Sequence, residues 1–136
     1  MKRRKFMALV SGAAVWPFIG VSEGATARGA ELLMFERPHC VWCQRWDSEI
    51  APAYPRTIEG SLAPLRRMHI QDQAIAGVLL ERPVTVTPTF VLANDGREIG
   101  RILGHPGNEV FYGLLGELLK RLPGSSGVAE PARSRW

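Results

Sequence analysis

The chain has 136 residues, of which 46% are hydrophobic and 22% are charged, and its formal net charge is +4. This length has room for one domain, and the composition is typical of a globular protein rather than a disordered one. The charge does not indicate a nucleic-acid-binding protein, because four basic residues lie at positions 2–5. From residue 28 onward there are 13 basic and 12 acidic residues, and no basic patch that would bind phosphates.

Residues 1–27 resemble an export signal. The basic start MKRRK precedes an apolar run over residues 6–21, and ATA at 25–27 offers small residues for cleavage. The paired arginines of RRKFM resemble the twin-arginine signature. The alternative is an uncleaved membrane anchor, but the run is shorter than the ~20 residues needed to span a bilayer. We therefore predict a signal peptide over residues 1–27 and a periplasmic protein that begins near Arg28.

The first half of the remaining chain has the pattern strand, helix, strand. ELLMFE (Glu31–Glu36) is an apolar run of strand length, and Cys40–Ala51 has a helical face that ends before Pro52. Residues 52–64 hold three prolines and one glycine, which indicates an irregular excursion with one short helical turn. LRRMHI (Leu65–Ile70) alternates between apolar and polar residues, as a strand does.

The second half predicts a helix, a hairpin and a second helix. Asp72 is expected to cap a helix that ends before Pro83. Two β-rich runs, Thr89–Ala93 and Glu98–Leu103, flank NDG, a strong hairpin signal. Asn108 is expected to cap the last helix. The predicted inner faces are Ile75, Val78 and Leu79 in the first helix, and Val110, Phe111, Leu114, Leu115, Leu118 and Leu119 in the second.

The order β-α-β-α-β-β-α predicts an α/β fold. Its first half can form a parallel βαβ unit, and its second an antiparallel hairpin with a covering helix, which gives a mixed four-stranded sheet with helices on both faces. The domain is predicted over residues 28–122. The tail, residues 123–136, is rich in Gly, Ser, Pro and Ala, lacks a periodic apolar face, and is predicted to be disordered.

The two cysteines of the chain, Cys40 and Cys43, stand in RPHCVWCQRW, and three kinds of site are compatible with them. A zinc site needs further ligands, and the three histidines of the chain lie at no usual paired spacing. A structural disulfide would close too small a loop to remove much unfolded-state entropy. A redox dithiol explains more, because Cys40 would face the positive end of a helix, which favours a thiolate, while Cys43 would be better covered.

A second feature is TPT at Thr87–Thr89, which opens the strand that leads into the hairpin. Pro88 cannot donate to a sheet ladder, so it must lie at a strand start or edge. A cis peptide is one way to build the tight turn there. The alternative is an ordinary proline at the beginning of a strand.

Together, these features resemble a thioredoxin-fold protein: a strand, C-x-x-C at the start of a helix, then Thr-Pro-Thr before a hairpin and a terminal helix. The resemblance covers residues 31–122. It implies a thiol–disulfide oxidoreductase with Cys40 and Cys43 as catalytic residues. It also implies that Pro88 is cis and faces the dithiol, where the adjoining backbone, with Thr87, would hold a target peptide as a strand.

More narrowly, W-x-x-E-I-A-P-x-Y-P and the following A-P-L-R-R resemble the periplasmic SoxS-type thioredoxins of bacterial sulfur-oxidation systems. That resemblance implies a cysteine-bearing sulfur carrier as the partner, and a membrane thiol–disulfide transporter as the electron source. No metal, nucleotide, flavin or nucleic acid is implied, and we expect a monomer. The alternatives are a reductant in cytochrome c maturation and a non-catalytic binding module.

Two positions depart from the thioredoxin pattern. The buried aspartate of that family, which is associated with proton transfer at the resolving cysteine, is matched by Met34, and the nearest carboxylate is Glu36 on the same side of the strand. The pair between the cysteines is Val41-Trp42, whose bulk would narrow the range of partners.

The other conspicuous side chains receive simpler interpretations. Trp42 is expected to contact the substrate, His39 to tune Cys40 or to cap the turn, and Trp46 to lie in the core. Arg66 and Arg67 are expected to be solvated, and His105 to belong to a turn.

Overall fold

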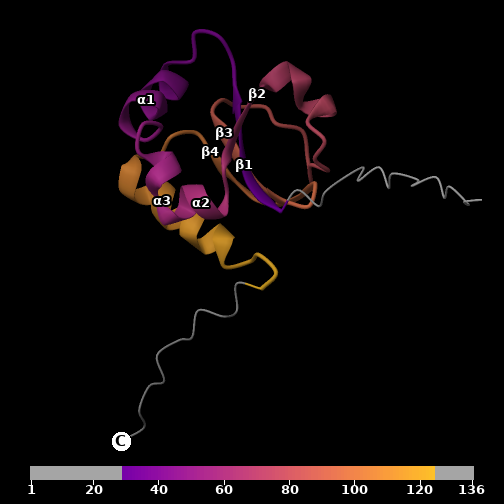
Figure 1. The fold of residues 1–136 in the computed structure, drawn as a ribbon. Coiled ribbons are helices and arrows are strands. Elements are labelled where there is room, and N and C mark those ends of the chain that lie inside the picture. The colour runs from indigo at the N-terminus through magenta and orange to yellow at the C-terminus, as the bar shows by residue number, and fades with distance from the viewer. Residues whose placement is uncertain (1–28, 125–136) are drawn as a thin grey trace, which may run out of the picture.

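The computed structural model describes residues 29–124, which form one mixed sheet with helical segments on both faces (Figure 1). The predicted signal peptide and residues 125–136 of the predicted tail lie outside the described residues. The sheet has the strand order β2-β1-β3-β4, in which β2 is parallel to β1 and the β1–β3 and β3–β4 pairs are antiparallel. The strands are β1 (Ala30–Glu36), β2 (Leu65–His69), β3 (Thr89–Asn94) and β4 (Arg97–Leu103).

The helices divide between the two faces of the sheet. In Figure 1, α1 (Val41–Glu49), α2 (Ile58–Leu62) and α3 (Asn108–Leu119) lie on one side, and the segment that follows β2 lies on the other. That segment contains the 3-10 helix η2 (Ile70–Ile75). The predicted fold class and the mixed four-stranded sheet are therefore confirmed.

Strand β1 explains how one short apolar run supports two cores. Successive side chains of a strand point to opposite faces. Leu32 and Met34 belong to the buried cluster under α1 and α3, whereas Leu33 and Phe35 belong to the cluster on the η2 side. All four are completely buried, which is why this strand is continuously apolar instead of alternating.

An aromatic cluster packs α1 and α3 against the sheet. Trp46, which is fully buried as predicted, lies 5.0 Å from Phe90 between ring centroids, and Phe90 lies 4.9 Å from Phe111. Tilted and edge-to-face aromatic pairs add about 0.5–1.5 kcal/mol each beyond the area they bury. The orientation of α1, and so of the cysteines at its start, is set by this packing.

Helix α3 begins close to the predicted residue, but its cap and its buried face differ. Gly107, at φ 104°, is the capping residue, and Asn108 is the first helical residue. Val110 and Leu114 are 52% and 44% exposed, so their assignment to the inner face was wrong. The buried residues recur at i, i+4, i+7 and i+8, a narrower stripe than predicted: Phe111, Leu115, Leu118 and Leu119.

The predicted helix between Asp72 and Pro83 is wrong. The helical turns there are the six residues of η2, and the capping residue is His69, whose Nδ1 accepts the N–H of Gln71 at 3.1 Å. Ile75 and Leu79, predicted to face inward, are 79% and 64% exposed.

Glycine and sheet pairing explain why no longer helix forms there. Gly77 has φ +70°, a left-handed conformation typical of helix ends. Leu79 then pairs with the start of β4, donating to the carbonyl of Gly96 at 2.7 Å and accepting from the N–H of Glu98 at 3.1 Å. Ala76 and Val84 fill the core on this side, and Val78, the third residue of the predicted inner face, is partly buried against them.

Two other predictions can be compared with the structure. Residues 52–64 contain two short helices, η1 (Tyr54–Arg56) and α2, where one turn was expected. The NDG hairpin is confirmed, with Asp95 and Gly96 at φ 50° and 77° between β3 and β4, as a tight two-residue hairpin requires. Among residues 29–124, no helix has the length and apolar character needed to cross a membrane.

Candidate active site

The two cysteines lie where β1 gives way to α1. Cys40 is the N-cap of α1, Cys43 lies in its first turn, and a disulfide joins them across a Cα–Cα distance of 5.2 Å. Cys43 is only 4% exposed and belongs to the core cluster beside Trp46, whereas Cys40 is half-buried at the surface. An incoming group therefore reaches Cys40 more easily than Cys43.

Two donors point at the sulfur of Cys40. The backbone N–H of Cys43 lies 3.2 Å from Sγ, and the hydroxyl of Thr87 lies 3.3 Å from it. The sulfur also lies at the positive end of the α1 dipole. After reduction of the disulfide, both donors and the helix terminus would favour negative charge on the Cys40 sulfur.

The Thr87–Pro88 segment lies against the dithiol, although it is 47 residues away along the chain. The Thr87–Pro88 peptide is cis, as the resemblance implied. Pro88 is buried, and its carbonyl accepts the N–H of Gly104 at 2.7 Å. The structure thus brings Cys40, Cys43 and Thr87 together beside the cis-proline turn.

His39 completes the loop before Cys40. It has φ +62°, a left-handed conformation that is uncommon for residues other than glycine and is often found at functional sites. Its side chain lines the same hollow as both cysteines.

Trp42 lies two residues after Cys40 and is 53% exposed, so its ring is available to a partner. It lines a cavity of about 330 Å³ together with Arg45, whose guanidinium carbon lies 5.7 Å from the ring centroid, and His105. Glu49 accepts from Arg45 at 2.8 Å and pairs with Nε2 of His105 at 2.8 Å. These hydrogen bonds, with that of Arg45 the stronger, lower the pKa of Glu49.

His105 lies in a loop, as predicted, and its side chain also makes a contact that was not predicted. Its side chain is 2% exposed and links the loop before α3 to the end of α1. Its position in the sequence, just before Pro106, carried no signal of that contact, because Glu49 lies 56 residues earlier.

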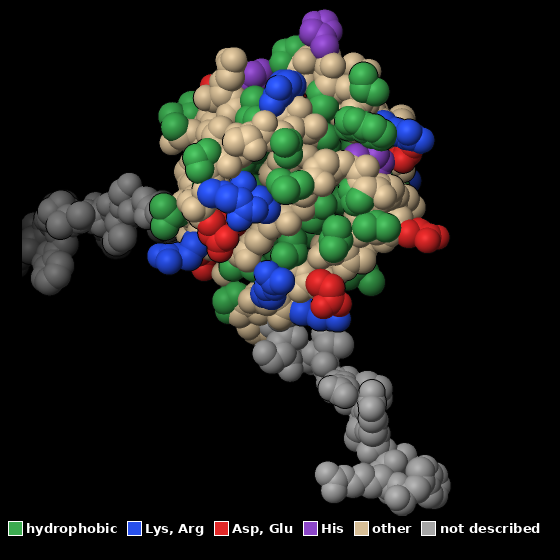
Figure 2. Space-filling model, turned by 180° about the vertical axis from the view of Figure 1, so that it is seen from behind, with side chains coloured by type: hydrophobic (Ala, Val, Ile, Leu, Met, Phe, Trp, Pro, Cys, Tyr) green, Lys and Arg blue, Asp and Glu red, His purple; other side chains and the backbone are tan. Residues whose placement is uncertain are grey.

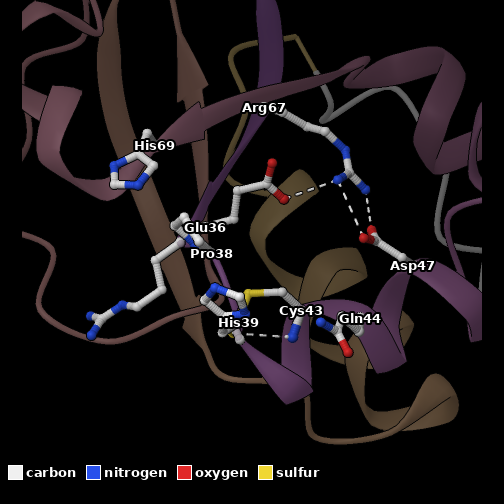
Figure 3. A pocket seen from close by; sticks show the side chains of 10 residues that line it. Glu36, Pro38, His39, Cys43, Gln44, Asp47, Arg67 and His69 are labelled. Atoms are coloured by element: carbon white, nitrogen blue, oxygen red, sulfur yellow. Dashed lines mark hydrogen bonds and ion pairs between the residues drawn. A yellow bond between two sulfur atoms is a disulfide. The ribbon is translucent and has the colours of Figure 1, made fainter.

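A charged cluster that no pattern in the sequence indicated lies near the dithiol (Figure 3). Arg67, expected to be solvated, donates from Nη1 to Glu36 at 2.9 Å and pairs with both carboxylate oxygens of Asp47. The hydrogen bond with Asp47 is the main cause that raises the pKa of Arg67. Strands β1 and β2 and helix α1 each contribute one residue, so only their packing could have shown the cluster.

Arg66 is also paired rather than merely solvated. It donates from Nε and Nη2 to the two oxygens of Glu31 at 2.9 and 2.8 Å, and to the carbonyl of Ala76 at 2.8 Å. The bonds to Glu31 raise the pKa of Arg66. The ion pairs of Arg66 and Arg67 both depend on the pairing of β1 with β2, and the pattern of a single strand does not contain that information.

The surface provides no uniformly charged face in the view of Figure 2, where Lys and Arg side chains alternate with Asp and Glu and with hydrophobic groups. Within residues 29–124, no group of three or more His, Cys, Asp or Glu side chains is arranged to hold a metal ion.

The chain is similar to solved structures of thioredoxins. The chain is similar to the periplasmic thioredoxin SoxS from Paracoccus pantotrophus in its reduced form, with 49% identity over 68% of this chain and 97% of that chain, and a TM-score of 0.65. It is also similar in fold to a thioredoxin from Fasciola hepatica, with 23% identity over 70% of this chain and 82% of that chain, and a TM-score of 0.50. No family model matches the sequence, and no curated protein matches it either.

Proposed function

The chain belongs to the thioredoxin family of thiol–disulfide oxidoreductases, and from this premise we propose that it reduces disulfides or blocked thiols on a cysteine-bearing sulfur carrier in the periplasm. The observation that carries the proposal is the 49% identity with a periplasmic thioredoxin over nearly all of that protein. The unequal exposure of the two cysteines supports it.

The reaction is a pair of thiol–disulfide exchanges. The Cys40 thiolate attacks the partner disulfide, forms a mixed disulfide and releases one partner sulfur as a thiolate. Cys43 then attacks the sulfur of Cys40, so that the Cys40–Cys43 disulfide forms and the second partner sulfur leaves. Two electrons pass from the protein dithiol to the partner.

The surroundings of the dithiol suit a protein substrate. Thr87 and Pro88 would hold the backbone of the partner, Trp42 would contact its side chains, and His39 would tune Cys40. The dithiol supplies the redox equivalents, so the proposal needs no metal or bound cofactor. A membrane thiol–disulfide transporter would return electrons to the Cys40–Cys43 disulfide, and the protein would act as a monomer.

Insulin reduction tests the redox function itself. The wild-type protein, kept reduced by dithiothreitol, should accelerate the precipitation of insulin, and Cys40→Ser should lose this acceleration while its circular dichroism spectrum is retained. If folded Cys40→Ser were as active as the wild type, the dithiol would have only a structural role, as in a binding module.

Covalent trapping tests the partner. Cys43→Ser lacks the thiol that releases the partner, so it should accumulate a mixed disulfide through Cys40 in the periplasm of a sulfur-oxidising host. The trapped protein should be a sulfur carrier with a reactive cysteine, and Cys40→Ser is the matched control that should trap far less. Recovery of cytochrome c maturation proteins alone would favour the alternative function.

A further inference from the structure

A hollow of about 370 Å³ lies beside the dithiol, between the ends of β1 and β2 and the first turns of α1. Figure 3 shows charged side chains around it, with the carboxylates of Glu36 and Asp47 turned toward Arg67. Cys43 forms part of its wall. Its titratable or charged lining groups are Glu36, Arg37, His39, Cys40, Cys43, Asp47, Arg67 and His69.

Cys43 needs a proton acceptor in the second exchange, because the thiolate is the nucleophile and the thiol is not. Although Cys43 lies in the first turn of α1, its side chain is buried, and burial disfavours the charged form of a thiol. The buried β1 side chains of the same cluster are Leu32 and Met34, and neither can take a proton. The hollow is therefore the side from which a base can reach Cys43.

Among the carboxylates, Glu36 is the better placed to accept a proton. Arg67 occupies both oxygens of Asp47, but it bonds only Oε2 of Glu36. Among residues 29–124, Oε1 of Glu36 has no hydrogen-bond partner. Glu36 is held at the end of β1 by that single bond, and its side chain remains 30% exposed, so water has access to it.

The two histidines of the hollow are less suitable. His69 already uses Nδ1 to accept from the N–H of Gln71, so the neutral ring presents a donor at Nε2. His39 adjoins Cys40 in the chain and is exposed, which places it beside the attacking sulfur instead of the buried one.

We propose that Glu36 accepts the proton of Cys43, through water in the hollow, when Cys43 resolves the mixed disulfide. The proton passes from Cys43 Sγ to Glu36, the Cys43–Cys40 bond forms, the bond between Cys40 and the partner breaks, and the partner sulfur leaves as a thiolate that is protonated by solvent or by Glu36. Arg67 positions the carboxylate, and Asp47 orients Arg67. This inference rests on the redox function proposed above.

A two-phase reaction separates the role of Glu36 from that function. Reduced protein mixed with excess dithiobis(nitrobenzoate) should release one thionitrobenzoate when Cys40 attacks, and a second when Cys43 resolves the adduct. In Glu36→Gln, the second phase near neutral pH should slow by about tenfold or more, as for loss of a general base, while the first phase is preserved. The second-phase rates of Glu36→Gln and the wild type should converge at high pH, where hydroxide deprotonates Cys43. Added imidazole should restore part of the second-phase rate that Glu36→Gln loses.

The matched control is Glu31→Gln. It removes a carboxylate from a bond with Arg66, which is also a pair between β1 and β2, but Glu31 does not line the hollow, so both phases should keep their rates. Glu36→Asp, which keeps the carboxylate, should retain more of the second phase than Glu36→Gln. His39→Gln should change mainly the first phase.

Each other result has one meaning. An unchanged second phase in Glu36→Gln would overturn the assignment, and so would a faster one, because a purely electrostatic carboxylate would hold Cys43 protonated and its removal would accelerate the step. A second phase that is slowed only by His39→Gln would make His39 the acceptor instead. A wild-type protein that showed no second phase would contradict the redox function itself.

Discussion

At the scale of single residues, the sulfur of Cys40 accepts hydrogen bonds from two distant parts of the chain. The N–H of Cys43 is supplied by α1, and the hydroxyl of Thr87 by the turn before β3. The first belongs to the backbone and stays when side chains are replaced. The second can be removed alone, which makes Thr87 the residue where the tuning of the sulfur can be measured.

Thr87→Val should slow the alkylation of Cys40 by iodoacetamide near pH 6 by about fivefold. A hydrogen bond to a charged group contributes on the order of 1 kcal/mol or more, so without it less Cys40 is ionised at this pH. The measurement is the rate of modification of the reduced protein against pH. The whole profile should move to higher pH.

Thr85→Val is the control for this substitution. Thr85 is exposed, and its carbonyl, rather than its hydroxyl, is the group that accepts from Arg37. The rate of Cys40 alkylation should be unchanged in Thr85→Val. An equal slowing in both variants would mean that the loop, and not the hydroxyl of Thr87, controls the sulfur.

At the scale of elements, strand β4 holds the segment that leads to the active-site turn. Arg101 and Glu98 form an ion pair at 2.6 Å, with side chains that are 5% and 0% exposed. Glu98 accepts the N–H of Glu81 at 2.7 Å, and Arg101 donates to the carbonyl of Arg82 at 2.7 Å. The pair therefore ties residues 81–82 to β4, a few residues before Thr87.

Glu98→Gln should lower the free energy of unfolding at pH 7 by about 3–5 kcal/mol, because it leaves the charge of Arg101 buried without its partner. Urea denaturation measures the loss. Burial alone would raise the pKa of Glu98, but the hydrogen bonds from Arg101 and from the N–H of Glu81 outweigh it, and the folded-state pKa lies below 4.5.

The sign of the pH dependence follows from that lowered pKa. A depressed pKa contributes stability above the unfolded value, and this contribution is lost as the pH falls through the folded value. The difference between wild type and Glu98→Gln should therefore be largest near neutrality and shrink below about pH 4. Glu117→Gln breaks an exposed pair at the same i,i+3 spacing and should cost far less, because water screens exposed ion pairs. A loss equal to that of Glu98→Gln would contradict the role of burial.

At the scale of the whole molecule, two cores share one sheet. The larger cluster joins α1, α3 and one face of the strands, and the smaller joins the other face to the segment between β2 and β3. All members of both clusters lie within residues 30–122. The layers approach closely where β4 meets α3, because a Cβ on Gly100 would lie only 2.5 Å from Cδ2 of Leu118.

A chain of residues 28–122 should therefore have the same stability as a chain of residues 28–136. Every member of the two clusters is retained, so the thermal midpoints of the two chains should agree within about 2 °C, which corresponds to well under 1 kcal/mol for a domain of this size. Insulin reduction should also be equal. A midpoint lower by 10 °C or more would show that residues 123–136 contribute to the folded domain.

Local signals in the sequence were sufficient for β1, the hairpin, the helix over residues 108–119 and the place of the cysteines at the start of α1. Each depends on neighbours in the chain: an apolar run between breakers, Asp95 and Gly96 in a tight turn, a repeat near 3.6 residues, or a proline before a helix. The resemblance to thioredoxins added Pro88 to the site, which spacing alone could not do. The core position of Trp46 followed from its helical face.

Tertiary contacts decided the remainder. Leu79 has the apolar character of a helix core residue, yet hydrogen bonds with Gly96 and Glu98 hold it beside β4. Arg67 has the pattern of a solvated residue, yet the parallel pairing of β1 with β2 and the packing of α1 bring two carboxylates to it. The hydroxyl of Thr87 reaches Cys40 for the same reason. The free energy of such contacts depends on which atoms meet after the layers have packed, and the spacing of residues along one segment does not contain that information.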